Sequence, residues 1–138
     1  MCRIYVMTHK KCEIPENKLY SVMQVGSALH DDLGYLRDDT GDNISEKNPY
    51  YSELTGMYWV WKNDHESTVT GICHYRRYLL NERGSILGTS DILNLLKNYD
   101  IITTKLLTLN YSYYEAFGAD HNRADLDITA DIIRSDYP

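Results

Sequence analysis

The sequence is poor in cysteine and has no long apolar run. Its 138 residues contain three cysteines, Cys2, Cys12 and Cys73, without a CxxC pair, which argues against a disulfide framework or a zinc ribbon. The apolar stretch near the N-terminus is too short for a signal peptide, and about 18 consecutive apolar residues, as a membrane span requires, occur nowhere. We expect a soluble protein of the reducing cytosol, either free or at the inner face of the cell membrane.

Basic residues and phenylalanine are also scarce. The 14 Lys and Arg stand against 20 Asp and Glu, which argues against a nonspecific nucleic-acid binder, because such a protein needs a basic surface. Any phosphate recognition must therefore be local. Thirteen tyrosines accompany a single phenylalanine. Tyrosine suits the binding of polyhydroxylated or planar ligands, although half-buried strand and helix faces use it too.

Strand and helix patterns alternate along the chain, which by its length fits one domain over residues 1–138. The sequence predicts a first strand at residues 4–6 that ends in a polar loop, and then a long functional loop from residue 12 to 48. The later expected elements are a helix over 48–63, a buried strand over 69–73, a helix capped by Ser90, a strand over 100–103, a short helix with the capping box Ser112 and Glu115, and a last helix capped by Asp125. This alternation predicts an α/β fold with a mostly parallel sheet flanked by helices.

The stretch NPYYSELTGMYWVWKN reads as a buried helix. Asn48 is suited to cap it, and Pro49 fits its first position. Gly56 in its interior indicates close packing against a neighbouring backbone or a ligand. Apolar residues that recur at spacings of three and four predict the inward face: Tyr51, Leu54, Tyr58 and Trp61.

The stretch HYRRY follows the strand at 69–73 and is suited to bind an anion. On an extended segment His74 and Arg76 share one face, while Tyr75 and Arg77 share the other. A guanidinium offers a fork of donors that matches phosphate oxygens and stays charged. The alternative is that both arginines pair with local carboxylates.

Four acids are candidates for chemistry: Asp38, Asp39, Asp42 and Glu53. The stretch DDTGDNIS lacks the regular ligand spacing of an EF-hand and has natural turn residues, so it does not indicate calcium. Glu53 lies in an aromatic helix, where a carboxylate must pair with a cation or have a raised pKa.

Other polar residues give weaker signals. The one D-x-D tripeptide, Asp125 to Asp127, fits the start of a helix better than a metal site. His9, at the end of the first strand, and His121 are candidate ligand contacts. Cys73 and His74 are neighbours along a strand and face apart, which argues against a thiol nucleophile.

Several of these stretches, taken together and in order, resemble the bacterial family called domain of unknown function 4422. They are YVMTHK, GDNISEKNPYYSELTGMYWVWKN, GICHYRRYLL, KNYDIITTK and YEAFGADHNRADLDITADIIRSDYP. Family members resemble glycosyltransferases of capsular polysaccharide, exopolysaccharide and O-antigen synthesis. The family domain normally runs past the position of Pro138, so the chain resembles its N-terminal part.

The resemblance implies a GT-A-like fold that transfers a sugar from a nucleotide-sugar donor to a glycan or lipid-linked glycan. His74, Arg76 and Arg77 are then expected to stabilise the diphosphate leaving group in place of a metal, so no metal or other cofactor is required. Among the other expected site residues, His9 and Lys10 lie at the nucleotide loop, and Tyr75 and His121 are further donor contacts. Asp42, Asn43 and Ser45 are expected to contact the donor or the helix start, and Asp42 is also the expected base for the acceptor. Glu53 is expected beside the arginines or the sugar.

Two other functions remain open. The chain could be a noncatalytic glycan- or protein-binding module of a polysaccharide-assembly complex. Alternatively, it is a metal-dependent phosphohydrolase that uses Asp38, Asp39, Asp42 and His74, although their spacing is not that of a metal site. Peripheral membrane association and a homodimer through an exposed apolar sheet edge are further expectations.

Overall fold

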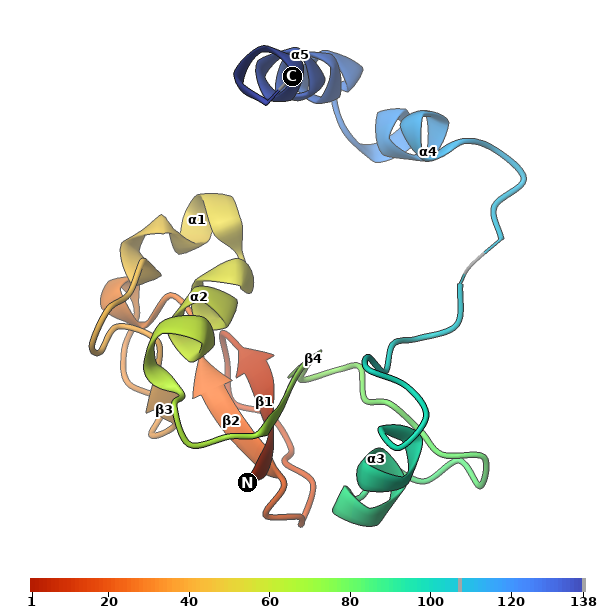
Figure 1. Cartoon of the computed structure of the whole chain (residues 1–138). Coiled ribbons are helices and arrows are strands. Elements are labelled where there is room, and N and C mark those ends of the chain that lie inside the picture. Colours follow the sequence, from red (N-terminus) through yellow and green to blue (C-terminus); the bar gives the residue numbers. More distant parts are fainter. Residues whose placement is uncertain (107, 138) are drawn as a thin grey trace. The chain divides into compact units, whose positions relative to one another are not determined.

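The computed structural model describes residues 1–106 and 108–137, which form two compact units divided between Thr103 and Thr104. The first unit contains β1 (Cys2–Thr8), β2 (Tyr20–Gln24), the short 3-10 helices η1 (Ser27–Leu29) and η2 (Ser45–Lys47), β3 (Leu36–Arg37), α1 (Asn48–Tyr51), α2 (Leu54–Asn63), β4 (Val69–His74) and α3 (Thr89–Leu95) (Figure 1). The second unit contains α4 (Tyr113–Asp120) and α5 (Arg123–Asp136).

The four strands form one parallel sheet in the order β3-β2-β1-β4. Strand β1 lies inside the sheet and pairs with β2 and β4, so that Val6 is level with Val22 on one side and with Cys73 on the other. All strands therefore end at the same edge of the sheet. The structure confirms the predicted α/β class and its parallel sheet.

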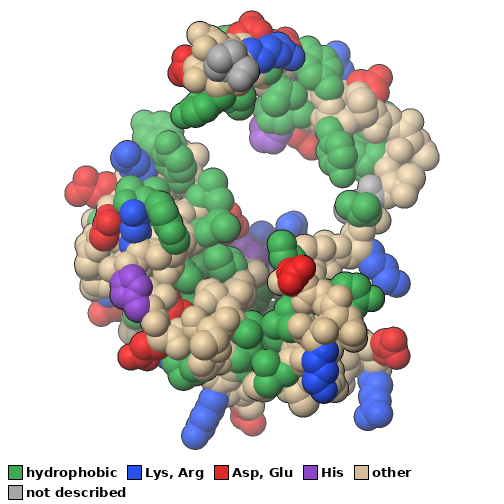
Figure 2. Space-filling model, viewed as in Figure 1, with side chains coloured by type: hydrophobic (Ala, Val, Ile, Leu, Met, Phe, Trp, Pro, Cys, Tyr) green, Lys and Arg blue, Asp and Glu red, His purple; other side chains and the backbone are tan. Residues whose placement is uncertain are grey.

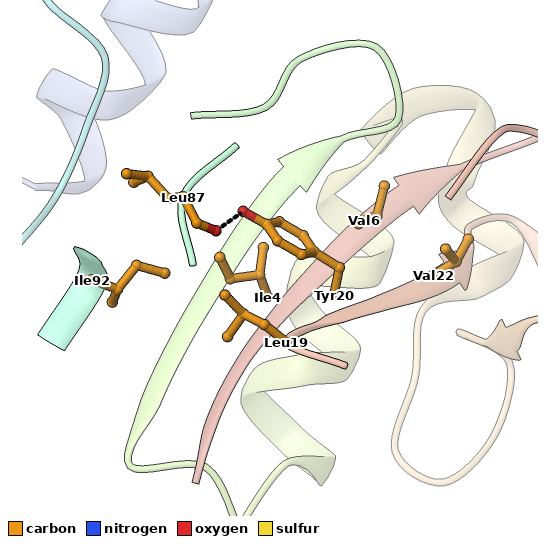
Figure 3. Packing of buried hydrophobic residues seen from close by; sticks show 7 residues of the cluster. All are labelled: Ile4, Val6, Leu19, Tyr20, Val22, Leu87 and Ile92. Carbon is orange, nitrogen blue, oxygen red and sulfur yellow. Dashed lines mark hydrogen bonds between the residues drawn. The ribbon is translucent and has the colours of Figure 1, made fainter. Parts of the chain in front are cut away.

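Both faces of β1 are covered, as its continuous apolar run requires. Tyr5 and Met7 pack toward Val60 of α2. Ile4 and Val6 point to the opposite face, where they form a second cluster with residues of β2, with Leu87 before α3 and with Ile92 in α3. In this cluster the hydroxyl of Tyr20 donates to the Leu87 carbonyl at 2.7 Å (Figure 3). Helices α2 and α3 thus flank the sheet on opposite sides (Figure 1).

Two expectations about strands are wrong. The region from residue 12 to 48 is not one long loop, because it contributes β2 and β3 to the sheet. Residues 100–103 form no strand. The predicted strand near residue 69 exists as β4, but it lies at the edge of the sheet and none of its residues is fully buried. Edge strands lack the second neighbour that would cover them.

The predicted helix over residues 48–63 exists in two pieces. Ser52, with φ 48°, breaks it between α1 and α2. The predicted inward face is wrong, because α2 buries Thr55, Gly56 and Val60 instead. Gly56 is as tightly packed as predicted: a Cβ there would lie 2.6 Å from Sδ of Met7 and 2.7 Å from Cγ1 of Val25.

The predicted capping residues agree with the structure at α4 and differ from it at the other helices. Ser112 and Glu115 form the expected capping box of α4. Three expected caps are wrong: Asn48 lies inside α1, Gly88 precedes α3 in place of Ser90, and Asn122 caps α5 in place of Asp125. Asp125 lies in the first turn of α5, where the helix dipole favours it.

Candidate active site

The ring of Tyr75 is the centre of a cluster of basic side chains at the carboxyl edge of the sheet. The centroids of the His9 and His74 rings lie 5.7 Å and 4.3 Å from its centroid. Nζ of Lys10 lies 5.4 Å from the ring centroid, and Cζ of Arg76 lies 5.3 Å from it. The loops after β1 and β4 meet here because neighbouring parallel strands end together, and this edge is where open α/β sheets bind ligands. The cluster brings together five of the predicted site residues.

His74 is held between the start of α2 and the turn that follows β4. Its Nδ1 accepts the backbone N–H of Arg76 at 3.2 Å, and its Nε2 lies 3.4 Å from Oε1 of Glu53. Burial lowers the pKa of His74; Glu53 opposes this effect, whereas Arg76, Arg77 and His9 reinforce it. Because Nδ1 accepts this backbone N–H, the ring proton of the neutral imidazole lies on Nε2, the nitrogen near Glu53. Glu53 is therefore not a buried acid of the helix, because its carboxylate is exposed and pairs with a histidine.

The expected alternation of Arg76 and Arg77 across the sheet is wrong. The strand ends at His74, and a turn closed by the bond from the Arg77 N–H to the His74 carbonyl at 2.8 Å follows. Both arginines are exposed. Within residues 1–106 and 108–137, neither forms an ion pair with an acid, so the alternative that both arginines satisfy local carboxylates is not supported. The guanidinium of Arg76 lies over the Tyr75 ring, and Arg77 is near enough to His74 for its charge to lower that imidazole's pKa.

Asp42 and Asn43 lie away from this cluster. The carboxylate of Asp42 accepts the hydroxyl of Tyr58 at 3.0 Å, and its backbone is bonded to the side chain of Asn63, the last residue of α2. Glu53 precedes the first residue of α2, so the two ends are about 15 Å apart along the axis. The amide of Asn43 bonds to Gly41 and to Ser45 within the same loop. The structure does not bring Asp42 to the arginines as the acceptor's base.

Asp38 and Ser45 belong to a fully buried hydrogen-bond network. The Asp38 carboxylate accepts the backbone N–H groups of Gly26 and Ser27 at 2.9 Å, the hydroxyl of Ser45 at 2.6 Å and that of Thr55 at 2.7 Å. Ser45 therefore shapes the loop before α1, and its hydroxyl does not reach the surface. This is the second of the two roles expected for it, and a donor contact is not available.

The acids of the alternative phosphohydrolase are not gathered into a metal site. Asp39 forms a two-pronged ion pair with Arg37, at 2.6 Å and 3.1 Å, and Arg37 lowers the pKa of Asp39. In the part of the chain that the structure describes, no group of three or more His, Cys, Asp or Glu side chains is placed to hold a metal ion. Asp38 is enclosed by its four donors. The geometry gives this alternative no support.

His121 belongs to the second unit. It ends α4, and its ring stacks on Phe117 with centroids 4.8 Å apart. In the D-x-D tripeptide, Asp127 accepts the hydroxyl of Tyr114 at 3.0 Å. The bond between Tyr114 and Asp127 joins α4 to α5.

A separate apolar cavity of about 330 Å³ lies in the first unit. Residues of β1, β2, β4 and α3 line it together with the segment at 100–102, and none of the predicted site residues is among them. One of the lining residues is Cys73, and burial raises the pKa of its thiol to about 11. This agrees with the expectation that Cys73 is not a nucleophile, because the thiolate is the reactive form.

The sequence is similar to a known family over nearly its whole length. The family described as "Domain of unknown function (DUF4422)" matches residues 3–138. The chain belongs to the DUF4422 family. This confirms the resemblance drawn from the ordered motifs, and the match spans both compact units.

A solved glycosyltransferase resembles the DUF4422 chain. The apo structure of WbbM, a bifunctional glycosyltransferase, shares 44% sequence identity with it at a TM-score of 0.54. The match covers 56% of this chain and 14% of the solved one, so the chain spans a small part of that protein's length. The likeness agrees with a glycosyltransferase-like α/β fold. No curated protein matches the chain. Among the described residues, none of the helices combines the length and apolar character needed to span a bilayer.

Sequence reasoning missed Thr8, which shapes the basic cluster of the DUF4422 chain. Its buried hydroxyl donates to the Lys10 carbonyl at 2.6 Å and lies 3.2 Å from the Lys10 N–H. This turn places His9 and Lys10 beside Tyr75. A threonine at the end of an apolar strand, followed by polar residues, is a signal for such a turn.

Proposed function

We propose that the chain is a glycosyltransferase domain that binds the diphosphate of a nucleotide-sugar donor at the cluster around Tyr75. The convergence of Lys10, His9, His74 and Arg76 on this ring, where the parallel strands end, carries the proposal. Arg77 is also exposed and is near enough for its charge to lower the pKa of His74. The similarity to WbbM supports the reaction class.

In the proposed reaction the bond between the sugar's anomeric carbon and the diphosphate oxygen breaks. The nucleoside diphosphate leaves with the bonding electrons, and a hydroxyl of the acceptor forms the new bond to the anomeric carbon and releases its proton to water. Lys10, Arg76 and Arg77 stabilise the negative charge that develops on the leaving oxygen. Fixed cations of this kind serve where other transferases use a metal ion, so the proposal requires no metal.

The other residues near the cluster have supporting roles in this proposal. Tyr75 and His9 offer ring surface to the nucleotide, and Glu53 accepts a sugar hydroxyl with the half of its side chain that stays exposed. The acceptor is a glycan or a lipid-linked glycan of a bacterial surface polysaccharide, which places the reaction at the cytosolic side of the membrane. Asp42 is left out of the chemistry because Tyr58 and Asn63 hold it along α2.

The test is the binding of uridine diphosphate, pyrophosphate and a set of nucleotide sugars, measured by thermal shift and by calorimetry with and without Mn²⁺. We expect a saturable rise in the melting temperature without the metal, because a ligand that binds only the folded state stabilises it. Arg76→Ala should weaken binding about tenfold, as the loss of a hydrogen bond to a charged group implies. Arg83→Ala, at another exposed arginine, is the control.

Two outcomes would overturn the proposal. One is the absence of any nucleotide or pyrophosphate binding by a folded chain, and the other is equal binding by the Arg76→Ala and Arg83→Ala variants. Saturable glycan binding without nucleotide affinity would instead support the noncatalytic binding module. Binding that appears only with Mn²⁺ would contradict the metal-free arrangement.

A further inference from the structure

Glu53 is the one acidic residue between Asn48 and Asn63. Figure 2 shows mainly hydrophobic side chains over α1 and α2. The Glu53 carboxylate keeps 50% of its side-chain surface exposed and lies against His74 of β4, with Oε1 3.4 Å from Nε2 of the imidazole. A half-exposed acid adds nothing to the apolar packing of these helices, so its position beside the basic cluster indicates chemistry.

The backbone directly before Glu53 is strained. Ser52 has φ 48° and ψ −131°, a conformation that L residues other than glycine rarely adopt. The Ser52 N–H donates to the Asn48 carbonyl at 2.8 Å, and the Ser52 carbonyl accepts Nδ2 of Asn48 at 2.7 Å and the hydroxyl of Thr55 at 3.2 Å. Strained backbone that its surroundings hold in place is concentrated at functional sites. Here the strain ends α1 and makes Glu53 the residue that precedes α2.

Glu53 and the basic side chains lie on opposite sides of the carboxyl edge of the sheet. The Tyr75 ring packs against the apolar cluster on the α3 face, whereas Glu53 precedes α2, which covers the other face. His74 lies between them, with its ring centroid 4.3 Å from that of Tyr75 and its Nε2 near Glu53. A donor whose diphosphate binds at Lys10 and Arg76 therefore has room for its sugar on the side of Glu53.

The neutral imidazole of His74 is not available as a base. Its Nδ1 accepts the Arg76 N–H at 3.2 Å, so the ring proton lies on Nε2. A neutral imidazole has one acceptor nitrogen, and this bond already uses it. The Nε2–H instead lies near one oxygen of the Glu53 carboxylate, which leaves the other oxygen free for a substrate. Such contacts are often long before a substrate binds.

We propose that Glu53 is the general base that activates the acceptor hydroxyl, an inference that rests on the function proposed above. The hydroxyl oxygen attacks the anomeric carbon from the side opposite the diphosphate, and its proton moves to the free oxygen of Glu53. The bond from the anomeric carbon to the diphosphate breaks, and its electron pair leaves with the diphosphate. Glu53 then gives the proton to water. A single direct displacement of this kind inverts the anomeric configuration, and His74 is the positioning residue that orients the carboxylate.

The test separates binding from turnover in the full chain. Calorimetry with uridine diphosphate and with pyrophosphate measures the donor site alone, and Glu53→Gln should leave both dissociation constants within about fivefold of the parent values, since exposed charges contribute little. Turnover is the release of uridine diphosphate from UDP-glucose, UDP-galactose and UDP-N-acetylglucosamine, with water as the acceptor. Glu53→Gln should lower kcat by about 10²–10⁴-fold with little change in KM, as the loss of a general base implies.

Three comparisons make the turnover test specific. Glu53→Asp should retain part of the rate, and Glu66→Gln, at an exposed acid before β4, should retain all of it. His74→Gln, which keeps an N–H donor, should retain more turnover than His74→Ala at equal pyrophosphate affinity. Proton NMR should show the β-anomer as the first sugar released from these α-linked donors. Circular dichroism checks that each variant is folded.

The outcomes distinguish this inference from the proposed function. A folded chain that binds neither uridine diphosphate nor pyrophosphate overturns the donor site, and the role of Glu53 with it. Binding without release of uridine diphosphate from any of the three donors overturns the role of Glu53 and leaves the donor site standing. The same holds for a Glu53→Gln variant with the parent rate, or for an α-anomer as the first product. Equal turnover of the His74→Gln and His74→Ala variants removes His74 from the arrangement.

Discussion

The side chain of Asn63 and the backbone of Asp42 exchange two hydrogen bonds. The Asp42 N–H donates to Oδ1 of Asn63 at 3.2 Å, and Nδ2 of Asn63 donates to the Asp42 carbonyl at 2.9 Å. The indole N–H of Trp59 adds a bond to the Thr40 carbonyl at 2.9 Å. These bonds fix the loop at residues 41–43 along α2. They give a physical reason why the GDNIS and YWVWKN stretches occur in the same chain.

Asn63→Ala should destabilise the first unit by about 1 kcal/mol, because it removes two exposed hydrogen bonds to the Asp42 backbone. Urea unfolding monitored by circular dichroism measures the change. Asn98→Ala, at an exposed asparagine after α3, should stay within about 0.5 kcal/mol of the parent. Equal stability of the two variants would show that the hydrogen bonds between Asn63 and the Asp42 backbone contribute nothing to the free energy of unfolding.

Asp38→Asn should be more damaging. All four groups that bond to this buried carboxylate are donors, so an amide NH₂ in place of one oxygen faces a donor and leaves buried groups unsatisfied. We expect a loss of about 2–4 kcal/mol in the free energy of unfolding. The exposed Asp31 provides the matched Asp31→Asn control. An unaffected Asp38→Asn protein would contradict the buried network.

His74 should make stability depend on pH. Its pKa is lowered in the folded chain, mainly by burial, so the unfolded chain binds the proton more readily. The contribution is fully present above the unfolded value of about 6.5 and is lost as the pH falls through the folded pKa. Unfolding free energies across this range should rise with pH, and His74→Gln should reduce that slope. Imidazole nitrogen chemical shifts offer an independent check, because they report whether Nδ1 is unprotonated.

Gly56→Ala should destabilise the chain even though alanine favours helices. The added Cβ would meet Sδ of Met7 and Cγ1 of Val25, and overpacking typically costs about 1–3 kcal/mol, more than the gain of up to ~1 kcal/mol in propensity. Gly118→Ala in α4 is the comparison, since its Cβ would meet the exposed side chain of Arg123, which can move aside. Thermal unfolding of both variants decides; a stabilised Gly56→Ala protein would mean that the helix and sheet are less closely packed.

The fold was predictable where the local pattern alone determines the element. The β-forming run of β1, the proline at the start of α1 and the capping box at Ser112 led to correct assignments. Strand β2 was missed because YSVMQ has a mixed pattern whose burial depends on pairing with β1 far along the chain. The face of α2 was wrong because the sequence has two apolar faces, and the close approach allowed by Gly56 selects the one that is buried.

The site was predictable to the extent that parallel strands end together. His9, Lys10, His74, Tyr75 and Arg76 follow or end neighbouring strands, and the fold brings them to one ring. The spacing of Asp42 and Ser45 carries no such information. Their positions depend on bonds to Tyr58 and Asn63 in α2 and to the buried Asp38, and these contacts between distant residues are not visible in a short motif.

The position of β4 at the end of the sheet also has a practical consequence. Residues 67–73 carry neither a charge nor a proline, and these are the usual means by which proteins keep sheet edges from joining one another. Concentrated or heated samples are therefore expected to aggregate through this strand. A lysine introduced at the exposed position Thr70 is the first change to make when preparing the protein for crystallisation.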